Sequence, residues 1–152
     1  MKTFQVPQKQ QEVLVRLRGG EELAGSFYFA ARGPGGSPGR LSDRLNDRTE
    51  KFLPLAYQSG AYLLNKDAIL SVRLDSPGAD IPSEGAEHHA PVRVRLVDGG
   101  ELEGYFDFSM PVGRERVVDF LNAAPRFVAL TGRQTTTLVN TDGIRVIEGS
   151  DD

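Results

Sequence analysis

The chain contains no cysteine, and only two of its 152 residues are histidine. The absence of cysteine excludes a disulfide scaffold, a zinc site with thiolate ligands and a thiol nucleophile. The two histidines are adjacent, and no Gly-x-Ser-x-Gly elbow, phosphate loop or metal-ligand cluster occurs. The sequence therefore predicts a protein that is not an enzyme and that holds no metal and no cofactor.

Long apolar segments are also lacking. No apolar run approaches the roughly 18 residues that a membrane helix needs. The first ten residues, MKTFQVPQKQ, contain no apolar stretch of the kind that signal peptides carry. We therefore expect a protein without a membrane segment that resides in the cytoplasm.

The chain has no large excess of charge of one sign. Its net charge is −3, and residues 12–75 carry 9 Lys/Arg against 8 Asp/Glu, while residues 92–148 carry 7 against 8. A domain that binds phosphates usually has a clear basic excess. The charge balance disfavours nucleic acid as a partner.

An internal repeat is the strongest signal that the sequence does contain. Residues 13–29 and 92–108 align without gaps and are identical at 10 of 17 positions. Two further blocks follow in the same order: RLSDRLN at 40–46 matches RVVDFLN at 116–122, and residues 52–72 match 127–147. Collinear matches of this kind indicate a duplication. We divide the chain into a first repeat at 12–75, a flexible linker at 76–91 and a second repeat at 92–149.

Each repeat has the pattern of short strands. Val13, Val15 and Leu17 alternate with Leu14, Arg16 and Arg18, the period of a half-buried strand, and Gly-Gly turns follow. A glycine in the middle of the second strand, Gly25 or Gly104, favours a bend. One or two helical turns and three more strands complete the repeat, which predicts a mainly β protein of two tandem five-stranded small barrels, each with a short helix between strands 2 and 3.

The strand pattern resembles that of Sm-like and SH3-like small barrels. The opening hairpin is similar to the first Sm motif, and the closing segments at Asn65–Ile69 and Asn140–Ile144 are similar to the last hairpin of bacterial Sm-like RNA chaperones. The Arg-x-x-Asp-x-Leu-Asn block followed by Phe-x-x-Leu is similar to an uncharacterised bacterial domain family. The resemblance implies a small-barrel fold. Two departures weigh against the RNA function: the helix position differs, and the uridine-binding residues are not recognisable.

The first candidate site is a basic row on the opening hairpin. Arg16 and Arg18, with Tyr28 expected nearby, resemble a surface that holds single-stranded nucleic acid. The alternative is cross-strand ion pairing with Glu22, and in the second repeat with Glu101, Glu103 and Asp107. We favour ion pairing in both repeats.

The second candidate is a polar set that persists in both copies of the helical block. Its residues are Arg40, Asp43 and Asn46 in the first repeat and Arg116, Asp119 and Asn122 in the second. Their spacing places them on one helix face, where they could form a docking surface or a small polar site. The favoured alternative is local pairing of Arg with Asp, with Asn at the C-terminal cap.

The adjacent histidines, His88 and His89, are a third candidate. They lie in the expected linker near Glu84 and Glu87, where they could bind a divalent metal weakly, but a rigid site is not expected. Taken together, these patterns predict a protein-binding or assembly module that takes a protein partner or a second copy of itself. The alternative is an Sm-like protein that binds RNA or single-stranded nucleic acid.

Overall fold

The computed structural model describes residues 7–75, 86–110, 113 and 116–149. The first repeat contains β1 (Gln8–Leu17), β2 (Glu22–Ala30), α1 (Leu41–Leu45), β3 (Phe52–Tyr57), β4 (Gly60–Asn65) and β5 (Ile69–Leu74). The second contains β6 (His88–Leu96), β7 (Glu101–Phe108), α2 (Val117–Ala123), β8 (Phe127–Thr131), β9 (Thr136–Asn140) and β10 (Ile144–Gly149). Short 3-10 turns lie at Pro34–Gly36, Lys66–Ala68 and Thr141–Gly143. The mainly β composition and the order of elements in each repeat are confirmed.

The predicted turn chemistry is also present. Gly20 and Gly99 adopt φ values of 91° and 90° in the two opening hairpins, a conformation that residues with a Cβ rarely adopt. The turns before β5 and β10 are closed by asparagine side chains, because Asn65 Oδ1 accepts from the Asp67 amide and Asn140 Oδ1 accepts from the Asp142 amide, both at 2.9 Å.

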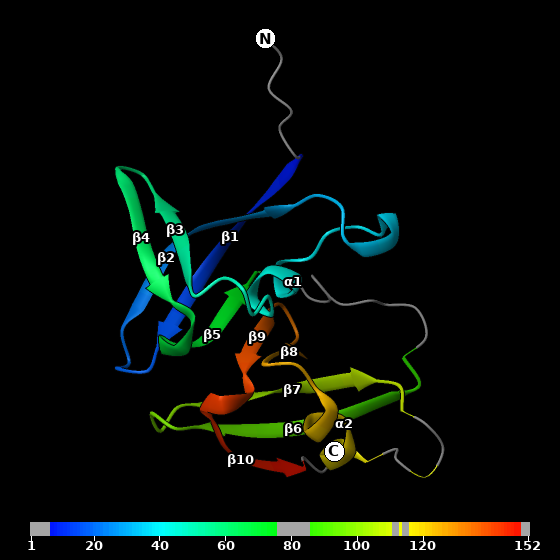
Figure 1. Ribbon diagram of the computed structural model, residues 1–152. Helices are drawn as coiled ribbons and strands as arrows, with labels where there is room; N and C mark the ends of the chain where they lie inside the picture. Colours follow the sequence, from blue (N-terminus) through cyan, green and yellow to red (C-terminus); the bar gives the residue numbers. More distant parts are fainter. Residues whose placement is uncertain (1–6, 76–85, 111–112, 114–115, 150–152) are drawn as a thin grey trace.

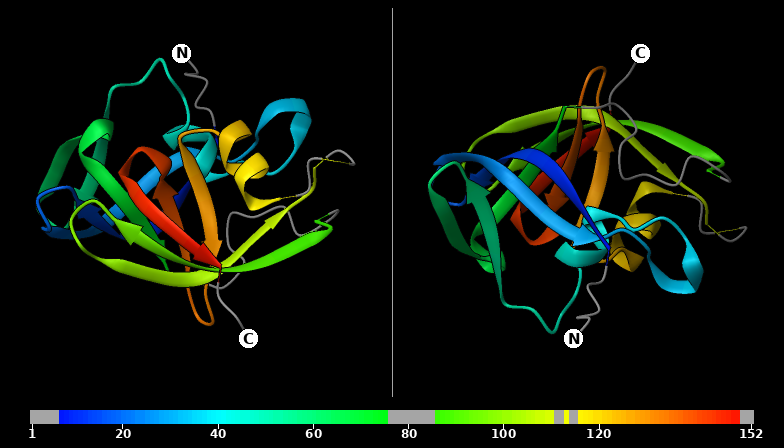
Figure 2. Two further views of the ribbon diagram at one scale, coloured as in Figure 1. Left: turned by 90° about the horizontal axis from the view of Figure 1, so that it is seen from below. Right: turned by 90° about the horizontal axis from the view of Figure 1, so that it is seen from above.

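The strands form one open sheet instead of two closed barrels. Its order is β10-β6-β7-β8-β9-β5-β1-β2-β3-β4, so each repeat has the same internal order and the repeats join where β9 pairs with β5. The prediction of two closed barrels was wrong because β5 gives its second edge to β9 of the other repeat and not to β4 of its own. The sheet is strongly bent, and β4 and β10 remain as its two ends (Figures 1 and 2).

The boundary between linker and second repeat also differs from the prediction. Residues 88–91 belong to β6, where His88 pairs with Phe108 and Pro91 with Tyr105. The proline that favoured a linker can lie in this strand because, among the described residues, β10 pairs only with residues 92–96, so Pro91 has a neighbouring strand on one side alone. Residues 76–85 of the predicted linker lie outside the described part of the chain.

The mid-strand glycines lie where two strands cross closely. A Cβ built on Gly25 would be 2.5 Å from the carbonyl oxygen of Ala56, and one built on Gly104 would be 2.5 Å from that of Thr131. At these crossings β2 meets β3, and β7 meets β8, through a single pair of residues. Glycine is required at both positions because any side chain would push the two backbones apart.

The apolar core consists of two clusters, one for each repeat. The first includes Val13, Leu41, Leu45 and Val72, and the second includes Val92, Val94, Phe106 and Leu130. The second repeat contributes to the first cluster, because Phe127 and Leu138 are buried in it and Ala129 packs against it. The two repeats therefore share part of one core.

Candidate functional site

The predicted basic row is held by hydrogen bonds and ion pairs. Arg16 Nε lies 2.6 Å from a carboxylate oxygen of Asp98, which belongs to the turn of the other repeat, and Arg18 Nε donates to the carbonyl oxygen of Asp67 at 2.5 Å. Tyr28 is not nearby: it pairs with Gln10, six residues from Arg16 along β1, a separation of about 20 Å in a strand. The structure does not bring the three predicted residues together.

Ion pairs also occupy the corresponding arginines of the second repeat. Arg93 lies 3.0 Å from Glu103, and Arg95 lies 3.7 Å from Glu101 and also pairs with Glu148. The favoured interpretation, cross-strand pairing, is confirmed here. In the first repeat the partner is Asp98 and not the expected Glu22, because the sheet continues across the junction of the repeats.

Asp98 has an electrostatic environment that favours its charged form. Its burial opposes ionisation, but the Gly100 amide donates to it at 2.8 Å and Arg16 at 2.6 Å, and together these bonds hold the pKa of the carboxyl below its ordinary value of 3.8. A carboxyl with a lowered pKa in the folded state stabilises the fold above its ordinary pKa and loses that contribution as the pH falls through the folded value.

We expect Asp98→Asn to lower the free energy of unfolding by about 1–3 kcal/mol near neutral pH, because Arg16 loses its charged partner. The difference from wild type should shrink as the pH falls below the ordinary pKa of 3.8. Urea denaturation of both proteins across this pH range measures the difference. Asp75→Asn is the control, because the side chain of Asp75 is 83 % exposed. A gap that stays constant down to acidic pH would contradict the expectation.

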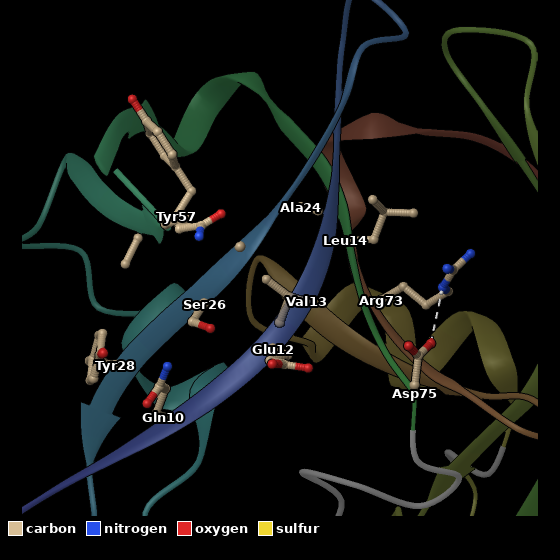
Figure 3. A pocket seen from close by; sticks show the side chains of 13 residues that line it. Gln10, Glu12, Val13, Leu14, Ala24, Ser26, Tyr28, Tyr57, Arg73 and Asp75 are labelled. Atoms are coloured by element: carbon tan, nitrogen blue, oxygen red, sulfur yellow. Dashed lines mark ion pairs between the residues drawn. The ribbon is translucent and has the colours of Figure 1, made fainter. Parts of the chain in front are cut away.

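Tyr28 lines an open pocket over β1, β2 and β3. The pocket has a volume of about 630 Å³. Figure 3 shows Gln10 beside Tyr28 at one end and the ion pair of Arg73 with Asp75 at the other, where the atoms are 3.5 Å apart. The pocket offers hydrogen-bonding groups, but among its lining residues there is no hydroxyl or amine paired with a base. Its geometry does not define a catalytic site.

The polar set of the helical block forms helix caps. The Arg40 amide donates to Asp43 Oδ2 and the Arg116 amide to Asp119 Oδ2, both at 3.3 Å, and the guanidinium of Arg116 also pairs with Asp119 at 3.1 Å. Asn46 is the C-terminal cap residue of α1. Local pairing of Arg with Asp and capping by Asn46 follow the favoured interpretation. The expected cap at Asn122 was wrong, because α2 continues to Ala123 and its C-terminal cap residue is Ala124.

Asn46 has a second role that the sequence did not predict. Its side-chain amide donates to the carbonyl oxygen of Phe127 at 3.1 Å, and its side-chain oxygen accepts from the Phe127 amide at 2.7 Å. It therefore binds both backbone groups of a residue in the other repeat. Its counterpart Asn122 is exposed, and its side chain has no hydrogen-bond partner within the described ranges.

The histidines lie in a strand and have structural contacts. His89 pairs with Asp107, and the ring of His88 lies 5.2 Å from that of Phe108. Of the residues that the structure describes, no three or more of His, Cys, Asp and Glu gather in a group that could hold a metal ion.

A buried lysine in the turn between β4 and β5 reaches the C-terminal end of α1. Lys66 is 3 % exposed, and its Nζ donates to the carbonyl oxygens of Arg44 at 2.7 Å and Asp47 at 2.9 Å. Burial lowers the pKa of Lys66, while the nearby carboxylate of Glu50 opposes that shift. These bonds satisfy the carbonyl groups at the end of the helix, so we assign Lys66 a structural role.

The two repeats contact each other along a junction formed by β5 and β9. In its ladder Val72 faces Leu138 and Ser71 faces Val139, and Leu138 is fully buried. Asn140, also fully buried, donates across the junction to the carbonyl oxygen of Ile69 at 2.9 Å. Arg126 of the second repeat pairs with Asp67 of the first at 2.5 Å. The junction therefore combines a strand ladder, a shared core and polar contacts.

The two ends of the sheet carry the same elements without a partner strand. Leu63 of β4 corresponds to Leu138 in the alignment, yet it is 72 % exposed. Phe52 corresponds to Phe127 and is 52 % exposed. At the opposite end, Val146 of β10 is 39 % exposed, whereas its counterpart Ser71 in β5 is buried. Phe127 and Leu138 are thus buried at the internal junction, whereas their counterparts Phe52 and Leu63 are exposed at one end of the sheet.

The sequence did not identify the strands and residues that form these exposed edges. Phe52 and Leu63 fit the alternating pattern of a strand as well as Phe127 and Leu138 do, so the pattern gave no sign that one pair is covered and the other is not. The available signal was the duplication. Once β9 of one repeat is known to pair with β5 of the other, their counterparts β4 and β10 must lie at the two ends of the sheet.

Comparison with known proteins finds no matching family model, no matching curated protein and no matching solved structure. Among the described residues, no helix is long and apolar enough to span a membrane. The functional proposal therefore depends on the geometry of the site alone.

Proposed function

We propose that the chain is a non-enzymatic assembly module that joins copies of itself head to tail, with β4 of one copy pairing with β10 of the next. The observation that carries this proposal is the internal junction, in which the same two kinds of strand already pair as β9 and β5. Unpaired edge strands readily accept another strand, and a contact between two different surfaces generates a ring or a filament.

The internal junction also specifies the register of the proposed pairing. Because Val72 faces Leu138, its counterpart Ile147 would face Leu63 of the next copy. Because Ser71 faces Val139, Val146 would face Leu64. Both pairs bring apolar side chains together, and Leu63 and Val146 are exposed in the single chain. The proposed register covers the apolar surface that the ends of the sheet leave open.

The resemblance to Sm-like and SH3-like small barrels belongs to this proposal. What supports it is that both repeats have five strands in the same order, with a close crossing at the second strand. No observation favours the alternative of nucleic-acid binding, since Arg16 and Arg18 are engaged with groups of the protein itself.

We expect Leu63→Lys to abolish assembly, because it places a charge at the centre of the proposed ladder. Sedimentation velocity over a range of protein concentrations measures the mass of wild type and variant. Tyr28→Lys is the control, since Tyr28 is 39 % exposed and lies in β2, an inner strand of the sheet. A wild type that remains monomeric at every concentration would refute the proposal, as would a variant that assembles like wild type. Adding RNA at low salt to the same experiment tests the alternative.

A further inference from the structure

The second repeat contains a groove between α2, β6 and β10. It has a volume of about 560 Å³ and is mainly apolar. The residues that form its walls and matter here are Val92, Val117, Val118, Leu121, Asn122 and Ile147. The groove is continuous with the open edge of β10, which supplies Ile147.

In the first repeat the equivalent space is filled by a side chain. The counterparts of Val92, Val117, Leu121 and Ile147 are Val13, Leu41, Leu45 and Val72, and all four belong to the core cluster that includes Phe127. The ring of Phe127 is 1 % exposed there. Thus one copy of the groove holds a phenylalanine from the neighbouring repeat, and the other copy holds nothing from the described part of the chain.

The chain carries a second phenylalanine of the same kind. Phe52 opens β3 as Phe127 opens β8, and it lies at the end of the sheet opposite the groove. It cannot fill the groove of its own chain in this fold, because the rest of the sheet separates β3 from β10. A second copy can present its Phe52 in the way that the second repeat presents Phe127.

The polar groups around the groove have matching counterparts. Asn46 binds the backbone of Phe127, and Asn122 occupies the equivalent place with its side chain unbonded in the described structure. The ion pair of Arg126 with Asp67 corresponds to Lys51 with Asp142 across the proposed contact. Lys51 is exposed, and Asp142 is 67 % exposed, so both are accessible.

We propose that the groove between α2, β6 and β10 is a socket for Phe52 of a second copy of this chain, with Asn122 hydrogen-bonded to the backbone of that Phe52. This inference rests on the proposed head-to-tail assembly and adds the side chain that gives the contact its direction. Aromatic residues that enter apolar pockets dominate the affinity of many interfaces. Strand pairing at the edge then sets the register, and the socket supplies most of the apolar contact.

Two variants and their mixture test the socket. Phe52→Ala removes the inserted side chain, and Val118→Glu places a charge in the groove at a residue that is 47 % exposed, so both chains should fold. Each variant alone should assemble at least about 30-fold more weakly than wild type, the factor that corresponds to 2 kcal/mol. A mixture should form a one-to-one pair and nothing larger, because only one intact Phe52 and one intact groove can meet. Sedimentation velocity measures all three samples.

The outcomes separate this inference from the proposed function. If Leu63→Lys prevents assembly while Phe52→Ala and Val118→Glu leave it unchanged, the strand edges pair but the socket is refuted. If both variants weaken assembly and their mixture forms no pair, the socket is also refuted. If the wild type is monomeric throughout, both proposals fail. Tyr28→Glu, at a residue that is 39 % exposed in the inner strand β2, is the control for the added charge.

Discussion

Replacing Phe127 by alanine is expected to lower the free energy of unfolding by about 3–5 kcal/mol, the range for removing a fully buried aromatic ring. The ring is 1 % exposed and packs into the core of the first repeat, although it belongs to the second. Because a domain of this size is stable by only about 5–15 kcal/mol, the loss should be a large share of the total. Urea denaturation measured by circular dichroism gives the difference.

Phe52→Ala is the matched control, because the alignment of the repeats places it at the equivalent residue. Phe52 is 52 % exposed, so at concentrations at which the chain is monomeric the change should cost less than about 1 kcal/mol. Equal losses at the two positions would mean that Phe127 is not a shared part of the first core. At higher concentration the control becomes the assembly test described above.

The order of elements could be predicted from the sequence because local chemistry determines it. Alternation of apolar residues marks the strands, glycines with positive φ close the hairpins, and Asn65 and Asn140 close the later turns through their own side chains. Each of these signals involves residues close together in the chain. Because the same pattern appears twice in the sequence, each of these signals could be read in two segments.

The joining of the two repeats could not be predicted in the same way. A strand ladder is made by backbone groups, which are the same for every residue other than proline, so the sequence of β5 does not record whether β4 or β9 is its partner. The ion pair of Arg16 with Asp98 illustrates the consequence: its residues are 82 positions apart, and Glu22 was the nearer candidate.

The sequence could not distinguish the two copies of the candidate site for a related reason. The polar sets of the two helices look alike in the sequence, and both cap their helices. Only the structure separates Asn46, which binds the second repeat, from Asn122, which has no such neighbour in the described part of the chain. A duplicated domain with one joined edge leaves one unused copy of each surface, and that asymmetry is what points to self-assembly.

The largest expected effect of a polar substitution is at Asn140. This residue is fully buried, its amide group donates to the Ile69 carbonyl across the junction, and its side-chain oxygen accepts from the Asp142 amide, both at 2.9 Å. Asn140→Ala leaves both backbone groups without partners, so we expect the free energy of unfolding to fall by about 2–4 kcal/mol. Hydrogen exchange of the β5 and β9 amides should accelerate along with the loss measured in urea.

Asn65→Ala is the matched control at the open edge. Asn65 makes the equivalent turn bond to the Asp67 amide at 2.9 Å, but among the described strands none lies beyond β4 to receive its side-chain amide. In the monomer this variant should therefore lose only about 1 kcal/mol, the contribution of one local bond. Equal losses for Asn140→Ala and Asn65→Ala would show that the bond to Ile69 contributes nothing to the junction. A larger loss for Asn65→Ala once the protein assembles would place that side chain in the corresponding contact, with the carbonyl group of Ile144 in the next copy as its acceptor.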